Sequence, residues 1–396
     1  MRRTAIVELG LVSVLALAGA FGACSSSDGG GGDPPADSGV VTDAPAGDVA
    51  TDAPTDSSGG CTPGLVTDPK GSPPADLAAF CAVKLEGGAI VPIGGSVPYD
   101  LNTPLFSDYA TKLRTVWVPP GQSAKWADPG PLDFPVGTVI TKSFGFPDDA
   151  RKPSPKMSWV ETRVLTRTKD GWIALPYVWD AAQTKATLKI EGEVRPIDFI
   201  QTTGDTVHAS YLIPSTGQCA RCHQIDGDVT LIGLKPRNLN RNYDYGTGSE
   251  SQLAHLAKLG WITGAPADAT TWPKLPKYDD PTTGTAEKRA RAWLDVNCAH
   301  CHNLGGSART TGLILQFEET DPHKTGICKN PVAAGKATGG LAYDVVPGKP
   351  DQSILFFRIN STEVGIVMPE IGRSVVHTQG VAVIKDWITA LTGTCP

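Results

Sequence analysis

Residues 285–302 read TAEKRARAWLDVNCAHCH, and this stretch decides how the C-terminal part of the chain is organised. Thr285 can cap a helix, and the apolar residues around Trp293 recur at helical spacing. The helix runs directly into two cysteines separated by two residues, Cys298 and Cys301, and a histidine follows. The sequence therefore predicts a helix that ends on a C-x-x-C-H motif.

A second C-x-x-C-H motif lies upstream, at Cys219, Cys222 and His223. C-x-x-C-H is the signature of covalent c-type haem attachment. Two thiols three residues apart on one helical turn can reach the two vinyl groups of a porphyrin, and the adjacent histidine can ligate the iron. We therefore expect two covalent haem c groups, held by the cysteines of both motifs, with His223 and His302 as iron ligands.

Paired C-x-x-C motifs have two other common uses. Two pairs can form a four-thiolate zinc site, but here 75 residues separate the pairs and a histidine follows each one. A single pair can also be a dithiol redox centre, which is expected beside a strand–helix unit in a cytosolic protein. Export of the chain, argued below, favours haem over both, because haem is attached to c-type cytochromes outside the cytoplasm.

The chain offers few ligands for the opposite side of the second iron. It has only three methionines; Met368 is followed by proline and precedes an amphipathic helix that starts after Thr378. We expect Met368 to be the second ligand of the iron at Cys298, which would raise the reduction potential. The alternative is a buried methionine that fills a gap in the core.

The sixth ligand of the first iron is less well defined by the sequence. His255 lies off the apolar stripe of a predicted helix and is the expected ligand. Met157, His208 and an open position are the alternatives. The carbonyl of Pro236 is a candidate to accept a hydrogen bond from the ring of His223, the contact that usually orients a ligating histidine.

Residues from about 99 to 214 have the pattern of short strands. Residues 159–167 and 172–179 alternate on either side of Asp170-Gly171, which indicates a β-hairpin. Several such strands predict a β-sandwich-like domain. Ser249 and Gln252 have the spacing of a capping box and predict a helix to about Gly260. The expected fold class is mixed, β-rich first and then mainly helical and loop-rich around the two motifs.

The N-terminus has the organisation of an export signal. Two arginines precede an apolar run over residues 9–23, with small residues directly before Cys24. This segment resembles the lipobox of bacterial lipoproteins, which implies removal of residues 1–23 and lipidation of Cys24; an ordinary signal peptide is the alternative. Ser25, where aspartate would retain such a protein at the inner membrane, favours the outer membrane. No run of 18 apolar residues is present, so we expect no membrane-spanning helix.

Residues 25–60 contain no aromatic residue, Leu or Ile, and are predicted to be a disordered tether. They hold seven aspartates and no other charge. Residues 1–24 carry a net charge of +1 and the whole 396-residue chain −6, so the part from residue 61 onward is neutral. A neutral body argues against nucleic acid as a partner, since phosphate binding needs a basic surface. Length alone allows two or three domains of about 150 residues.

Four further cysteines form an even set in an oxidising compartment. Pairing Cys61 with Cys81 and Cys328 with Cys395 is the simplest of three possible connectivities. The predicted organisation is a signal peptide (1–23), a lipidated cysteine and tether (24–60), a β-rich domain (61–215), a first haem-binding region (216–278) and a cytochrome c-like domain (279–396).

Several segments resemble a bacterial family of dihaem c-type cytochromes of unassigned role. They are DLNTPLFSDYA at 100–110, PRNLNR at 236–241, DVVPG at 344–348, MPE at 368–370 and DWI at 386–388. The order of helix, motif, irregular stretch, Met-Pro and closing helix is that of a class I cytochrome c domain. The resemblance implies haem binding but supplies no physiological partner.

The expected function is that of a periplasm-facing, lipid-anchored dihaem cytochrome on the outer membrane or the cell surface. It would carry single electrons between redox proteins and would not itself be an enzyme. One alternative is a peroxidase-like oxidoreductase whose first haem is five-coordinate. The other is a binding module in which the β-rich domain docks a partner and the haems serve sensing.

Overall fold

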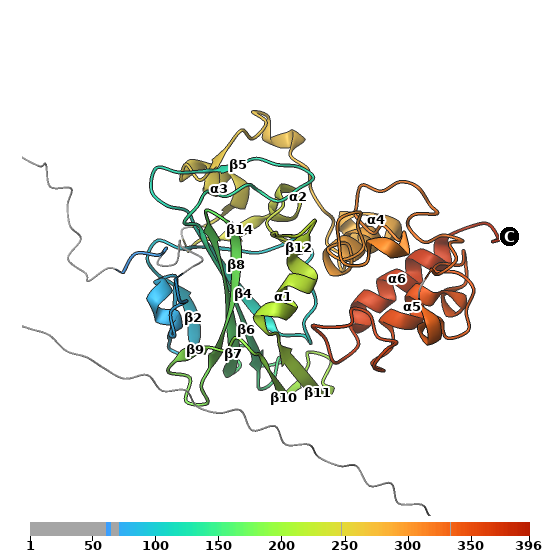
Figure 1. Cartoon of the computed structure of the whole chain (residues 1–396), viewed down its shortest axis with the longest axis horizontal. Coiled ribbons are helices and arrows are strands. Elements are labelled where there is room, and N and C mark those ends of the chain that lie inside the picture. The colour runs from blue at the N-terminus through green and yellow to red at the C-terminus, as the bar shows by residue number, and fades with distance from the viewer. Residues whose placement is uncertain (1–60, 65–70, 247, 333) are drawn as a thin grey trace, which may run out of the picture. The chain divides into compact units, whose positions relative to one another are not determined.

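The structure is a computed structural model that describes residues 61–64, 71–246, 248–332 and 334–396 (Figure 1). The predicted signal peptide, Cys24 and nearly all of the tether segment lie outside these residues. Within the part of the chain that is described, no helix combines the length and apolar character that crossing a bilayer requires.

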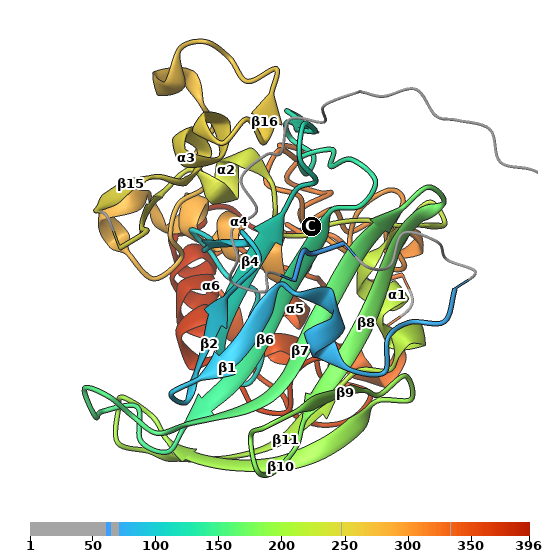
Figure 2. The ribbon, with the colours of Figure 1, turned by 90° about the vertical axis from the view of Figure 1, so that its left-hand side faces the viewer.

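A six-stranded antiparallel sheet is the centre of the β-rich part (Figure 2). Its strands, in spatial order, are β3 (Val97–Tyr99), β4 (Thr111–Trp117), β6 (Val139–Pro147), β7 (Met157–Thr168), β8 (Gly171–Trp179) and β9 (Ala186–Leu188). The predicted hairpin is confirmed: β7 and β8 pair from Glu161–Val178 to Thr168–Gly171. Gly171 has a φ of 129°, a conformation that glycine adopts at no steric cost.

The face of the sheet that carries Val139 is covered by the first described elements. Side chains alternate between the two faces along each strand. On this face Trp117, Val164 and Tyr177 pack with residues from the 3-10 helix η1 (Leu77–Phe80) and the β1–β2 hairpin. The hairpin strands are β1 (Val83–Glu86) and β2 (Ala89–Pro92).

The opposite face of the sheet is covered at both ends. At one end Phe144 and Val178 pack against Phe199 and Tyr211 of a long hairpin, β10 (Glu193–Ile200) and β11 (Thr206–Ile213) (Figure 2). The second layer is therefore a two-stranded hairpin and not a second large sheet, so the sandwich expectation holds only in part. The sequence pattern marks strands, but it does not say which strands share a sheet.

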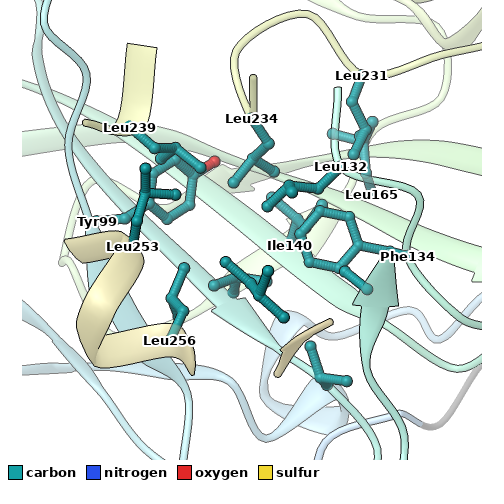
Figure 3. Close-up of a cluster of buried hydrophobic side chains, with 14 of the residues drawn as sticks. Tyr99, Leu132, Phe134, Ile140, Leu165, Leu231, Leu234, Leu239, Leu253 and Leu256 are labelled. Carbon is teal, nitrogen blue, oxygen red and sulfur yellow. The ribbon is translucent and has the colours of Figure 1, made fainter. Parts of the chain in front are cut away.

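The other end of the same face packs against two short helices, α2 (Pro236–Leu239) and α3 (Gln252–Lys258). Figure 3 shows Leu239, Leu253 and Leu256 from these helices directed toward Ile140 and Leu165 of the sheet. All five side chains are at least 92% buried. Between the two covered ends, the middle of this face carries basic side chains, described below.

A helical part follows the sheet. Its elements are α1 (Thr216–His223), α4 (Ala286–Asn297), α5 (Ile354–Ile359) and α6 (Thr378–Ala390). The helices α4 and α6 pack against one another through Trp293, Leu294, Ile384 and Trp387, all nearly inaccessible to solvent. Short two-stranded pairs complete the fold: β12 (Gln224–Ile225) with β13 (Asp228–Val229), β14 (Asn242–Asp244) with β15 (Ser249–Ser251), and β5 (Ala124–Lys125) with β16 (Ile262–Thr263).

The predicted capping box at Ser249 is wrong, because residues 249–251 form strand β15 and Ser251 caps α3. The side chain of Gln252, which a capping box would direct to the helix end, has long-range partners. Its Oε1 accepts from the Asp100 N–H at 2.6 Å, and its Nε2 donates to the Leu239 carbonyl at 2.9 Å. Tertiary contacts therefore decide where this helix begins.

Both disulfides of the simplest connectivity are present. Cys61 is joined to Cys81 and Cys328 to Cys395, with Cα–Cα distances of 5.4 and 5.2 Å. The remaining described cysteines are the four of the C-x-x-C-H motifs, and these are free.

Candidate functional site

The first motif lies on a helix of its own. The Ser215 hydroxyl accepts a hydrogen bond from the Gln218 N–H, and the Gln218 Oε1 accepts one from the Ser215 N–H, which completes a capping box at the start of α1. Cys219 and Cys222 therefore share one helical turn, Cys219 buried and Cys222 partly exposed. The sequence predicted no helix before this motif, and the structure places the motif inside a short one.

The ring of His223 is fixed by a backbone contact. Its Nδ1 lies 2.8 Å from the carbonyl oxygen of Thr230, and the Thr230 N–H donates back to the His223 carbonyl at 2.6 Å. Burial lowers the pKa of His223 to about 4, so the ring is neutral and Nε2 has a free lone pair. The expectation for Pro236 is wrong: its carbonyl accepts from Asn240, because the tight β12–β13 turn brings Thr230 back to the histidine first.

The second motif follows α4 as predicted. Thr285 caps this helix by accepting from the Lys288 N–H, and Cys298 is its C-cap residue. The chain then turns so that the N–H groups of Cys301 and His302 both donate to the Cys298 carbonyl. Burial raises the pKa of Cys298 to about 12 and lowers that of His302 to about 4. This histidine is therefore also neutral at physiological pH.

The two motifs meet at their second cysteines. The sulfur atoms of Cys222 and Cys301 and a ring nitrogen of His300 all lie within 4.8 Å of one another. A hydrogen bond from Cys222 lowers the pKa of the Cys301 thiol. Nearby, the Ser307 hydroxyl donates to the Arg221 carbonyl at 3.2 Å. Segments 80 residues apart in the sequence thus form a single thiol-rich junction.

Two cavities extend from this junction. The first, lined by Cys219, Cys222 and His223, has a volume of about 160 Å³. The second, lined by Cys298, Cys301 and His302, has a volume of about 510 Å³, within the roughly 300–1,000 Å³ range of small-molecule and cofactor sites. The cavities share a set of lining residues: Cys222, Asn297, His300, Ile359, Met368, Pro369 and Ile371.

Met368 is in the second cavity with His302, where the sequence placed it, and it also borders the first cavity. The loop that carries it is held by the guanidinium group of Arg373, which donates to the Met368 carbonyl from Nε at 3.0 Å and from a terminal nitrogen at 2.8 Å. The same group also donates to the carbonyls of Ile359 and Ser361, at 3.0 and 2.9 Å. Arg373 belongs to no motif in the sequence, so its role becomes visible only in the structure.

The three candidates for the sixth ligand at the first motif lie elsewhere. His255 stacks on Tyr245, with ring centroids 3.7 Å apart, and its Nδ1 contacts Glu250 at 2.7 Å. His208 is exposed and contacts Asp198 on the neighbouring strand. Met157 packs against the hydrophobic core on the far face of the sheet. None of them lines the first cavity, so the expectation for His255 is wrong.

A row of basic residues on the sheet faces the first cavity. Arg114, Lys142 and Arg163 are cross-strand neighbours on β4, β6 and β7, and all three line the cavity. Arg114 donates to Asp100 at 2.8 Å, and the Nε of Arg163 donates to Glu161 at 2.8 Å. Lys142 lies between Thr141 and Ser143, so no alternating pattern marks this position, and the sequence does not reveal that the strands align the three residues.

Comparison with protein-family models, with curated proteins and with solved structures yielded no match. The two motifs and the geometry around them are therefore the features of this chain that bear on its function.

Proposed function

We propose that this protein is a dihaem c-type cytochrome that carries single electrons between redox proteins. One haem would be attached to Cys219 and Cys222 and the other to the cysteines of the second motif. The motif signature, the resemblance of several segments to a family of dihaem cytochromes and the two adjoining cavities support this proposal. Bound haem supplies reversible one-electron chemistry of its iron; the chain supplies attachment, ligands and burial.

The donor groups around the first motif suit this role. A ligating histidine in a metal site almost always donates its other ring N–H to a carbonyl or carboxylate, which fixes the ring and raises its basicity. His223 has this arrangement, with Nδ1 against the Thr230 carbonyl and Nε2 available. The cavity at this motif is small, so its lining side chains must move outward when a macrocycle is attached.

The second motif suits haem through three features. Its cavity has the volume of a cofactor site, His302 is buried and neutral, and Met368 supplies a thioether from another segment of the same wall. Histidine with methionine is the ligand pair of high-potential cytochromes c. Arg373 has the role of holding the Met368 loop in place.

The observation that carries the proposal is the junction of Cys222 with Cys301. Groups attached to these two thiols would lie in neighbouring cavities that share a wall. Electrons could then pass between them within the protein, without a separate carrier. A β-rich part that covers one side of the first cavity would limit the exposure of that centre to water.

We further propose that the chain is exported and anchored through lipidated Cys24, on the periplasmic or outer surface of the outer membrane. The two disulfides fit an oxidising compartment. The neutral body gives no support for nucleic acid as a partner.

The test is the cofactor content of protein expressed together with the c-type maturation machinery. The mass of the mature chain should exceed the polypeptide mass by two haems. Cys219→Ser/Cys222→Ser and Cys298→Ser/Cys301→Ser should each retain one haem, which assigns one group to each motif. A wild-type protein without covalent haem would overturn the proposal.

A second candidate function rests on the same junction. Cys222, His300 and Cys301 place two sulfur atoms and one imidazole nitrogen within 4.8 Å, a donor set that zinc accepts in structural and catalytic sites. The chain would then be a metalloprotein without haem. Metal analysis distinguishes the two: one bound metal ion per chain that His300→Ala and Cys301→Ser both remove, in protein without haem, would favour the zinc site.

A further inference from the structure

Whether the iron of the first haem has a sixth ligand distinguishes electron transfer from catalysis, because an open coordination position would admit a substrate. Besides the motif histidine, five side chains that line the first cavity carry an amine, imidazole, thioether or phenol group: Tyr99, Lys142, His300, Met368 and His377. Each can be examined for whether its donor atom is already engaged.

Three of these side chains have contacts or an assignment elsewhere. His377 has both ring nitrogens occupied, since Trp293 donates to its Nδ1 at 3.0 Å and its Nε2 contacts the Tyr278 hydroxyl at 3.1 Å. One ring nitrogen of His300 belongs to the thiol junction; its Nδ1 is buried without a hydrogen-bond partner, so His300 is the rival ligand that the test below includes. The proposed function assigns Met368 to the second motif.

Tyr99 has a buried phenol whose pKa burial raises, so the group keeps its proton. Phenolate is the form that ligates iron, and Tyr99 does not supply it at physiological pH.

Lys142 is different from the other four. It lies in the middle of β6, flanked across the strands by Arg114 and Arg163, each of which has its own carboxylate partner. Among the described residues, Lys142 makes no hydrogen bond or ion pair; its Nζ lies 4.9 Å from the centre of the Phe144 ring. The one cation of the row without a partner therefore lines the cavity of the first motif.

The surroundings of Lys142 disfavour its charged form. Burial, together with the positive charges of Arg114, Lys112 and Arg163, lowers its pKa well below the ordinary value, and Glu161 opposes this only in part. A neutral amine has a lone pair that a metal ion can accept, whereas an arginine in the same place stays protonated. Lys142 and His223 line the same cavity.

We propose that the Lys142 amine is the sixth ligand of the first haem iron, with His223 as the other axial ligand. The inference rests on the proposed function. It deepens that function, because two nitrogen ligands leave the iron no open position for a substrate. It favours electron transfer over the peroxidase-like alternative. It also assigns a role to the β-rich part: the sheet would supply Lys142 as one iron ligand, and α1, which follows the sheet in the chain, would supply His223 as the other.

The test compares ferric spin states in the haem-loaded full chain by electron paramagnetic resonance and by the near-infrared charge-transfer bands. The wild-type first haem should be low-spin. Lys142→Ala and Lys142→Arg should both convert it to a high-spin form, because arginine keeps a positive charge but cannot ligate. Lys112→Arg is the matched control: Lys112 lies on the same face of the sheet and donates to the Ala110 carbonyl at 3.3 Å, and a variant that keeps the positive charge beside Lys142 should leave the spectrum unchanged.

Haem content and the Met–iron band of the second haem are measured in every variant, so that misfolding is recognised. A low-spin first haem in Lys142→Arg would overturn the inference and leave the lysine a purely electrostatic role. A high-spin wild-type first haem would overturn it as well, as would loss of the low-spin signal in His300→Ala with its retention in Lys142→Ala. Absence of covalent haem from Cys219 and Cys222 would instead show that the proposed function itself is wrong.

Discussion

Arg373 provides the most direct test of how the chain holds Met368. Its guanidinium donates to carbonyl oxygens of Met368, Val375, Ile359 and Ser361, over distances of 2.8 to 3.1 Å. Replacement by glutamine removes the charge and most of these donors. We expect Arg373→Gln to destabilise the loop between α5 and α6 and to release Met368 from its position in the second cavity.

The expected magnitude follows from the hydrogen bonds. A hydrogen bond to a charged group contributes about 1.5–3 kcal/mol net. Arg373 is only partly buried, so we take the lower figure and count only the two shortest bonds, to Met368 and Ser361. This gives about 3 kcal/mol, or roughly a hundredfold smaller folding equilibrium constant. Arg373→Lys should restore little of this free energy, because a single ammonium group cannot donate at once to the several carbonyls that the planar guanidinium group reaches.

The assay has two readouts. Denaturant unfolding should show a lower midpoint with an unchanged slope, and the Met–iron charge-transfer band of the loaded protein should weaken at constant haem content. Arg309→Gln is the control, since Arg309 is exposed and its side chain makes no hydrogen bond or ion pair among the described residues. An Arg373→Gln protein with wild-type midpoint and wild-type band would refute the reasoning.

Four other changes give equally specific expectations. Cys395→Ser removes the disulfide between Cys328 and Cys395, which are 67 residues apart. The chain-entropy model gives a loss of about 4 kcal/mol in the free energy of unfolding, which is measured by unfolding under non-reducing conditions. Cys24→Ser should abolish incorporation of radiolabelled fatty acid and release the protein from the membrane fraction; labelling equal to wild type would contradict the anchor. Burial lowers the pKa of His377 to about 3, below an unfolded value of about 6.5, so its contribution to stability is complete above pH 6.5 and is lost as the pH falls toward 3; His377→Phe should flatten that part of a plot of unfolding midpoint against pH. Met368→Ala should remove the Met–iron band and lower one midpoint potential in a redox titration while the other stays fixed; two unchanged potentials would make Met368 a core residue only.

Local sequence patterns determined the parts of this protein that depend on neighbouring residues. The hairpin around Asp170-Gly171, the helix capped by Thr285 and the closing amphipathic helix are where the sequence predicted them. The two disulfides also match the simplest pairing. The hairpin and the helices depend on turn chemistry and capping, which act within a few residues. The disulfide pairing is one of the three that four cysteines allow.

The tertiary structure decided the features that join distant segments. In the structure Cys222 lies beside Cys301. The ring of His223 contacts the Thr230 carbonyl, where the sequence suggested Pro236. His255 contacts Glu250 and does not line the first cavity. A histidine on the polar side of a helix has the same local pattern whether it faces a cavity or a nearby carboxylate.

The register of the sheet made the largest difference to the candidate site. Arg114, Lys142 and Arg163 come from three strands, and no motif in the sequence connects them. Only the pairing of β4, β6 and β7 aligns them, and only the packing of other segments over the middle of that face turns them into the wall of a cavity. Strand pairing and burial are set by the whole chain, because they depend on which surfaces remain to be covered once every element has formed.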